Sequence, residues 1–126
     1  MLRVFLVSGD ETFCELLRDF FQSGDEFLVC GKARDGIDAV KMAIELAPDL
    51  IVLEQEIPPM DIILQTAKAI KTALPEIPVF LVMDLSDIGA EKKALSTGVE
   101  AIFEKTEDDL SLLLKNARAV CGFEQT

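Results

Sequence analysis

Short apolar runs alternate with longer amphipathic stretches along the whole chain. Almost only apolar residues occupy 4–7, 27–30, 50–53, 79–83 and 101–103. Such runs are typical of strands buried on both faces of a parallel sheet. Between these runs, and after the last one, apolar residues recur at helical spacing. The pattern therefore predicts five strands, each followed by a helix, in a single domain spanning residues 1–126.

Each predicted helix has an apolar stripe that should face the core. The five stripes are Phe13, Leu16, Leu17, Phe20 and Phe21; Ile37, Val40, Ile44 and Ala47; Ile63, Ala67, Ile70 and Leu74; Ile88, Ala94 and Leu95; and Leu110, Leu113, Leu114, Ala117 and Cys121. Repeated strand–helix units with short connections indicate right-handed crossovers. The expected fold is α/β, a doubly wound five-stranded parallel sheet of order 2-1-3-4-5 with helices on both faces.

In this topology, functional residues lie just past the carboxyl ends of the strands, above all strands 1 and 3. The residues at or just past the ends of the first, third, fourth and fifth strands are Ser8, Gly9, Asp10, Glu54, Met83, Asp84 and Lys105. Because the strands are parallel, these ends should meet at one edge of the sheet. The sequence therefore predicts that any site lies there.

The charge balance excludes several classes of partner. The chain has 23 acidic and 12 basic residues and a formal net charge of −11. Such a surface repels nucleic acid and anionic lipid, which are bound largely through Lys and Arg. No apolar run approaches the roughly 20 residues that span a bilayer, and the N-terminus lacks the features of a signal peptide. We therefore expect a cytoplasmic domain that binds neither nucleic acid nor membrane.

The sequence also argues against catalysis and against a bound cofactor. It contains no histidine, which excludes Ser-His and Cys-His catalysis and histidine metal sites. Cys14, Cys30 and Cys121 form no C-x-x-C pair, so we expect reduced thiols that act as small hydrophobic groups. No Gly-rich phosphate loop follows the first strand. The prediction is a domain with no metal, no cofactor and no enzymatic activity.

Four segments have the order and spacing of a known family. They are Val4-Phe5-Leu6-Val7-Ser8-Gly9-Asp10, Ala33-Arg34-Asp35-Gly36, Pro48 to Glu54 with Ile57-Pro58-Pro59-Met60-Asp61, and Thr97 to Lys105. Together they resemble the receiver domain of bacterial response regulators, which act in two-component (phosphorelay) signal transduction. The resemblance covers nearly the whole chain and implies the same five-stranded fold.

A receiver transfers a phosphoryl group to its own aspartate, with Mg²⁺ held by converging carboxylates. The resemblance places the family's acidic pair at Ser8 and Gly9, which bring no anionic oxygen, and Asp10 at the next, less critical position. The acceptor aspartate corresponds to Glu54. Lys105 matches the family's lysine. The resemblance thus implies a degenerate acidic pocket.

The positions that report phosphorylation in the family have also changed. The hydroxyl residue corresponds to Met83, the small residue after it to Asp84, and the aromatic switch residue to Ile102. Met83 and Ile102 suit a buried β-environment and are expected to be core side chains. A relay between a hydroxyl and an aromatic residue is therefore not expected here.

Several of these residues have a second interpretation. Ser8 and Glu11 fit a helix capping box, which the local pattern favours over a role for Ser8 in the site. Glu54 is either a solvated carboxylate or a permanent negative charge in place of phosphate. Lys105 is either a surface lysine or the partner of Glu54. We expect a Glu54–Lys105 ion pair at a partly exposed edge.

The leading hypothesis is a degenerate receiver that cannot accept phosphate and acts by protein–protein interaction. Its partner would be a sensor kinase, an output domain or another copy, bound through the fourth helix, fifth strand and fifth helix. One alternative is a receiver phosphorylated on Glu54. Others are a flavin- or nucleotide-binding domain, or a small enzyme with Asp10, Glu54 and Asp84 as acid–base groups.

Overall fold

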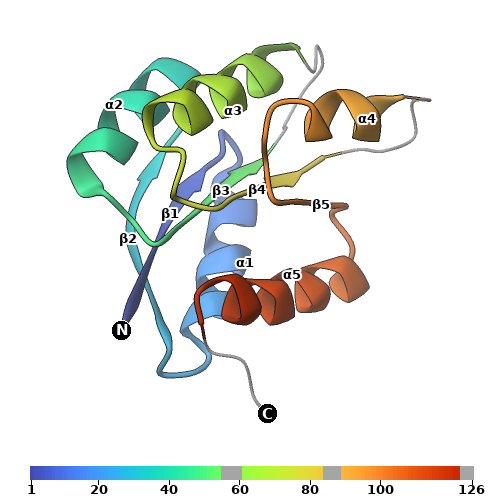
Figure 1. Ribbon diagram of the computed structural model, residues 1–126. Helices are drawn as coiled ribbons and strands as arrows, with labels where there is room; N and C mark the ends of the chain where they lie inside the picture. The colour runs from blue at the N-terminus through green and yellow to red at the C-terminus, as the bar shows by residue number, and fades with distance from the viewer. Residues whose placement is uncertain (55–60, 84–88, 123–126) are drawn as a thin grey trace.

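Strands and helices alternate as the hydrophobic pattern predicts (Figure 1). The computed structural model describes residues 1–54, 61–83 and 89–122. Within these residues the strands are β1 (Leu2–Val7), β2 (Phe27–Ala33), β3 (Leu50–Glu54), β4 (Val79–Val82) and β5 (Ala101–Phe103). The helices are α1 (Glu11–Gln22), α2 (Gly36–Leu46), α3 (Asp61–Ala73), α4 (Ala90–Leu95) and α5 (Glu107–Val120). Strand β2 runs three residues further than its apolar run indicates, and Ile88 lies outside the described residues.

All neighbouring strands are parallel, and their order is β2-β1-β3-β4-β5. The predicted fold is therefore confirmed. The register pairs Val7 with Leu53, and Glu54 with Val82. The carboxyl ends of the three central strands thus lie level with one another, and the residues that follow them meet at one edge of the sheet.

The pairing of β1 with β2 contains one irregularity. Val4 pairs with Val29 and Phe5 pairs with Gly31, so Cys30 is an extra residue on β2. An inserted residue of this kind is a β-bulge, which bends and twists the strand that carries it. The bulge lies on an edge strand, because β2 ends the sheet.

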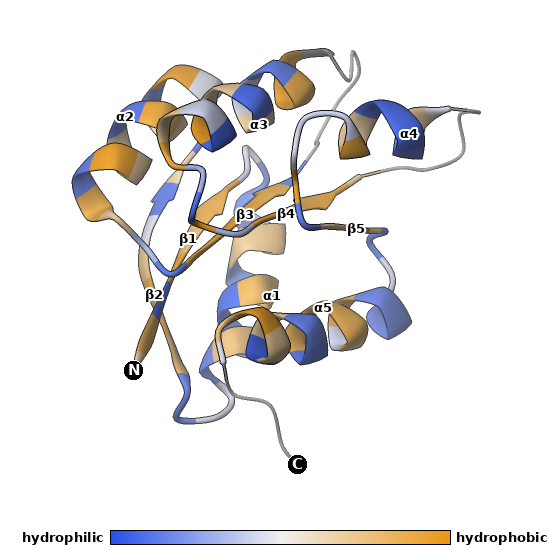
Figure 2. Cartoon of the chain, viewed as in Figure 1, coloured by the Kyte–Doolittle hydropathy of each residue, from blue (hydrophilic) through white to orange (hydrophobic). Residues whose placement is uncertain are grey.

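Two different cores fill the two faces of the sheet. Helices α1 and α5 cover one face, and α2, α3 and α4 cover the other (Figure 1). The first core is aromatic and includes Phe13, Phe21, Phe27, Phe80 and Phe103. The second has small helix residues, namely Ala39, Ala43, Ala67, Ala90 and Ala94. The hydropathy colouring shows the strands as an apolar layer between the helices (Figure 2).

Most of the predicted helix faces are confirmed. The buried helix residues that the sequence assigned to the core include Phe13, Leu17, Phe21, Ala67, Ile70, Ala94, Leu110, Leu113 and Ala117. Leu16 and Leu95, in contrast, are 43% and 49% exposed. Each of these two lies at the border of its stripe, where the helix surface turns away from the sheet.

The predicted face of α2 is wrong for Ile37 and Ile44, whereas Val40 packs against the core as predicted. Ile37 is 85% exposed and Ile44 is 53% exposed, whereas Ala39 and Ala43 are completely buried. Ala47 lies beyond the helix, where it ends α2 in a left-handed conformation with φ of 45°. Both stripes of α2 are apolar, and the one that packs against the core contains Ala39 and Ala43 together with the partly buried Met42 and Leu46. Large aliphatic side chains are left on the surface as a result.

The start of α2 packs tightly against α3. A Cβ atom added to Gly36 would overlap the hydroxyl oxygen of Thr66, a buried residue of α3. That hydroxyl donates a hydrogen bond to the carbonyl oxygen of Ile62, 3.0 Å away. Gly36 is therefore required because the space between the two helices has no room for a larger side chain.

Among the described residues, no helix has the length and apolar character needed to cross a bilayer.

Candidate functional site

Glu54 is a buried carboxylate at the carboxyl end of β3. Its side chain has no exposed surface. Oε1 accepts a hydrogen bond from the hydroxyl of Ser8, and Oε2 lies 2.7 Å from Nζ of Lys105. This contact is an ion pair, and no other described group donates a hydrogen bond to Oε2. The negative charge is thus balanced mainly by one ammonium group.

Ser8 belongs to this site and not to a capping box. The N-cap of α1 is Asp10, whose carboxylate accepts a hydrogen bond from the backbone N–H of Phe13, 3.2 Å away. Glu11 pairs with Lys32 instead, at 2.9 Å. Because the helix begins at Glu11, Ser8 lies too far upstream to cap it, and its hydroxyl donates to the buried carboxylate of Glu54. Hydrogen bonds to a charged acceptor are the stronger ones.

Lys105 follows β5, and its side chain forms a solvent-exposed part of the site. Its side chain is 37% exposed. Besides Glu54, its ammonium group lies 3.7 Å from a carboxylate oxygen of Asp10 and 4.6 Å from the centre of the Phe13 ring. The expected Glu54–Lys105 ion pair is confirmed. Neither the surface-lysine interpretation of Lys105 nor the solvated-carboxylate interpretation of Glu54 holds.

The two switch-equivalent positions lie in the core next to the site. Met83 is 1% exposed, and its backbone N–H donates to the carbonyl of Phe103 at 2.9 Å. Ile102 is partly buried against the same cluster as Met83. Neither side chain carries a hydroxyl, so the hydrogen bond that a hydroxyl residue would supply cannot form here. Asp84 lies outside the described residues.

The described residues at this edge do not fit a divalent cation. Mg²⁺ requires several oxygen ligands, usually with one or two carboxylates. Ser8 and Gly9 offer no carboxylate, and Lys105 already occupies one side of Glu54. In residues 1–54, 61–83 and 89–122, no three Asp, Glu, Cys or His side chains are grouped to hold a metal.

The three cysteines are free thiols. Burial raises the pKa of Cys14 and of Cys30, and it raises the pKa of Cys121 to about 11. A thiol is reactive only as the thiolate. At neutral pH these groups are therefore protonated and behave as small apolar side chains.

Comparison with known proteins identifies the family of this fold. The model of the response regulator receiver domain family matches residues 4–117. The chain belongs to this family. In the solved structure of the response regulator domain of Thermotoga maritima CheB, the same fold recurs with a TM-score of 0.83 and 27% identity over 99% of both chains. A LuxR-family response regulator from Staphylococcus aureus, 21% identical with a TM-score of 0.82, shares the fold.

The curated relatives of this receiver domain are longer proteins. A protein-glutamate methylesterase/protein-glutamine glutaminase from Pyrococcus abyssi is 32% identical over 119 residues, which is 93% of this chain and 32% of that protein. One of the same name from Caldanaerobacter subterraneus is 34% identical over 116 residues. The chain thus spans about a third of the length of these relatives.

Sequence reasoning missed one contributor to the receiver site. Phe13 was predicted only as a core residue of α1, yet its ring lies under the ammonium group of Lys105. A cation over an aromatic face is held by the ring quadrupole. No local sequence signal indicates this contact, because the two residues are far apart in the chain and meet only through the sheet.

Proposed function

We propose that this receiver domain does not accept phosphate and acts by contact with a protein partner. The observation that supports the proposal is the state of Glu54, whose side chain is buried and whose two oxygens contact Ser8 and Lys105. We also propose that residues 1–126 form one domain and that it is cytoplasmic. Three free thiols and a single sheet that joins all described elements support this.

Phosphoryl transfer to Glu54 faces three obstacles. A nucleophilic oxygen must approach phosphorus, but one oxygen accepts from Ser8 and the other faces Lys105. The transferred group carries charge that a metal normally neutralises. The carboxylates that would hold that metal are replaced by Ser8 and Gly9. Each obstacle acts on the chemical step itself, so the proposal does not depend on the identity of the phosphate donor.

Glu54 can nevertheless supply part of what phosphorylation supplies. A phosphoryl group adds nearly two negative charges and three acceptor oxygens. Glu54 brings one charge and already engages Lys105, the lysine that corresponds to the family's site lysine. Because Met83 and Ile102 replace the hydroxyl and aromatic residues of the relay, the domain would remain in one arrangement whether or not Glu54 is charged.

The partner surface we propose consists of α4, β5 and α5. Candidate partners are a sensor kinase, an output domain or a second copy. Leu95 on α4 and Leu112 on α5 are 49% and 48% exposed, which supports a contact surface with an apolar component. The relatives named as methylesterases are about three times longer, and we attribute no methylesterase activity to these 126 residues.

Incubation with Mg²⁺ and acetyl phosphate should leave the mass of the intact protein unchanged. The reason is that both oxygens of Glu54 already contact Ser8 and Lys105, and that Ser8 and Gly9 stand in place of the family's acidic pair. Intact-mass spectrometry checks this directly. A variant with Ser8→Asp, Gly9→Asp and Glu54→Asp is the matched control for the assay conditions. A stable gain of one phosphoryl mass in the natural chain, lost in Glu54→Gln, would show that Glu54 is a phosphoacceptor.

Neutralising Glu54 should have little effect on the proposed partner surface. If the domain has one fixed arrangement, amide protection across residues 89–106 in Glu54→Gln should stay within about tenfold of the natural chain. Hydrogen exchange with mass spectrometry measures this, with β1 and β3 as internal references. A change of several orders of magnitude confined to residues 89–106, in Glu54→Gln or in Lys105→Ala, would show that the switch still operates.

A further inference from the structure

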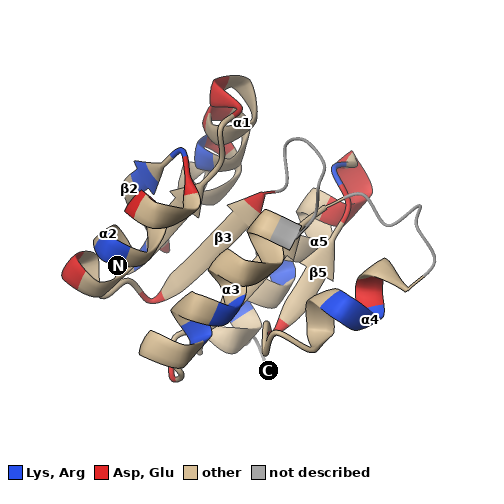
Figure 3. Ribbon diagram, turned by 90° about the horizontal axis from the view of Figure 1, so that it is seen from above, with Lys and Arg blue, Asp and Glu red and all other residues tan. Residues whose placement is uncertain are grey.

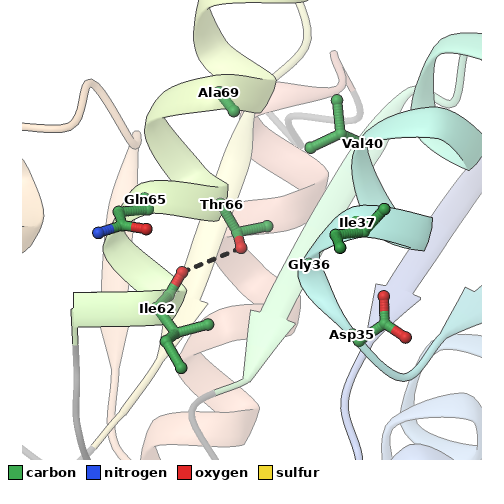
Figure 4. A pocket seen from close by; sticks show the side chains of 8 residues that line it. All are labelled: Asp35, Gly36, Ile37, Val40, Ile62, Gln65, Thr66 and Ala69. Atoms are coloured by element: carbon green, nitrogen blue, oxygen red, sulfur yellow. Dashed lines mark hydrogen bonds between the residues drawn. The ribbon is translucent and has the colours of Figure 1, made fainter.

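An apolar groove separates α2 from α3 on the surface of the domain (Figure 4). Its volume is about 430 Å³. Ile37 and Val40 of α2 line one wall, and Ile62 and Ala69 of α3 line the other. Ile37 and Ile62 are 85% and 62% exposed. Large aliphatic side chains on facing walls of a groove favour an apolar partner group over water.

A second groove lies on the other side of α3, between α3 and α4. Its volume is about 290 Å³, and Gln65 borders both grooves. Leu64 lies in this groove with the exposed side chains of Lys68 and Lys93. Ser96 and Thr97 also line it, but their hydroxyls donate to backbone carbonyls at 2.6 Å. The two ammonium groups therefore dominate its polar character.

Positive charge gathers at the groove between α3 and α4, which Lys68 and Lys93 line with no acidic residue, whereas Asp35 lines the groove between α2 and α3. Helix α3 contains two lysines and one aspartate, and residues 89–99 contain two lysines and one glutamate. Lys71 is neutralised by Glu100 at 2.9 Å. Lys68, Lys92 and Lys93 form no ion pair among the described residues. The charge view shows this basic region on α3 and α4 (Figure 3).

We propose that the face formed by α2, α3 and α4 binds an acidic amphipathic segment of a partner protein. Carboxylates of the segment would pair with Lys68 and Lys93, and its apolar side chains would enter the groove beside Ile37 and Ile62. A small anion would leave the apolar groove empty. A second copy of this chain would bring together two domains that each carry a net charge of −11, which long-range repulsion opposes. This surface adds to the proposed function and does not depend on whether Glu54 accepts phosphate.

The inference is tested with a short fluorescein-labelled peptide in which glutamate and leucine repeat at helical spacing. Fluorescence anisotropy at physiological ionic strength should show binding. Amide chemical-shift changes should concentrate in α2, α3 and α4. Lys68→Glu with Lys93→Glu should weaken binding by roughly tenfold or more, because two attractive pairs become repulsive. Peptides with serine for leucine, or lysine for glutamate, should bind much more weakly.

The matched control is Arg18→Glu with Lys115→Glu, which makes the same change of charge on exposed positions of α1 and α5, on the opposite face of the sheet. Equal loss of binding in both double variants would overturn the inference, since only net charge would then matter. So would shift changes confined to α4, β5 and α5. Sedimentation analysis provides a further test. If the natural chain is a dimer that Lys68→Glu with Lys93→Glu converts to a monomer, the inference is overturned, because a second copy of the chain then covers this face.

Discussion

Replacing Lys105 with methionine should lower the free energy of unfolding by roughly 2–3 kcal/mol. The substitution leaves the wholly buried carboxylate of Glu54 with Ser8 as its one remaining partner among the described residues. Removing one member of a buried pair typically costs about 3–5 kcal/mol, and the partial exposure of Lys105 reduces this value by letting water approach. Denaturant-induced unfolding measures the change. This exceeds the value of about 1 kcal/mol typical of a pair at an exposed edge.

The control for this prediction is Glu54→Gln. Its amide oxygen can still accept from Ser8, while Lys105 turns to solvent, so the loss should stay below about 1 kcal/mol. In the Glu54→Gln background, Lys105→Met should then cost little, because no buried charge remains. If Lys105→Met were equally destabilising in both backgrounds, the ion pair would not be the cause, and lost packing of the lysine stem on Phe13 would account for the effect.

Replacing Gly36 with alanine should destabilise the domain by roughly 1–3 kcal/mol. At an ordinary helix position this substitution is stabilising, because alanine reduces the entropy of the unfolded chain. Here the new Cβ would overlap the hydroxyl of Thr66, a β-branched residue of α3 with little freedom to turn away. Helices α2 and α3 would have to separate. Thermal or denaturant unfolding checks the sign as well as the size.

The control for this prediction is to make Gly36→Ala in a Thr66→Ala variant, which lacks the hydroxyl oxygen that the new Cβ would overlap. In that background Gly36→Ala should become neutral or stabilising by up to about 1 kcal/mol. The hydrogen bond lost from Thr66 lies within α3, to Ile62, so it does not join the two helices. An unchanged penalty in the Thr66→Ala background would show that the required space is set by something other than Thr66.

The strands and their order could be predicted because each strand is a short apolar run and each crossover is short. The buried face of α2 could not. Ile37 and Ile44 lie on one apolar stripe, and Ala39 and Ala43 lie on another. The spacing of apolar residues in the sequence does not indicate which of the two stripes faces the core. The packing of α2 against the sheet and α3, a property of the assembled fold, determines which stripe is buried.

The candidate site was predictable to the extent that parallel strands align their ends. From this alignment, the contact between Glu54 and Lys105 could be predicted. It did not identify the role of Ser8, since the local capping pattern with Glu11 competes with an acceptor 46 residues away. The capping pattern of Ser8 and Glu11 can be read from neighbouring residues in the sequence. The hydrogen bond from Ser8 to the buried carboxylate of Glu54 forms only once β1 and β3 lie side by side, so it cannot be read from the local sequence.

The two edges of the sheet limit how this chain can aggregate. An edge strand exposes unpaired backbone groups on which another strand can add. Here one edge, β5, has only three residues, and the other, β2, is interrupted by the bulge at Cys30 and carries Lys32 paired with Glu11. Neither offers the long, flat template on which cross-β growth depends. Half of the residues are hydrophobic, yet strand addition at either edge is hindered, and association should proceed through helix surfaces.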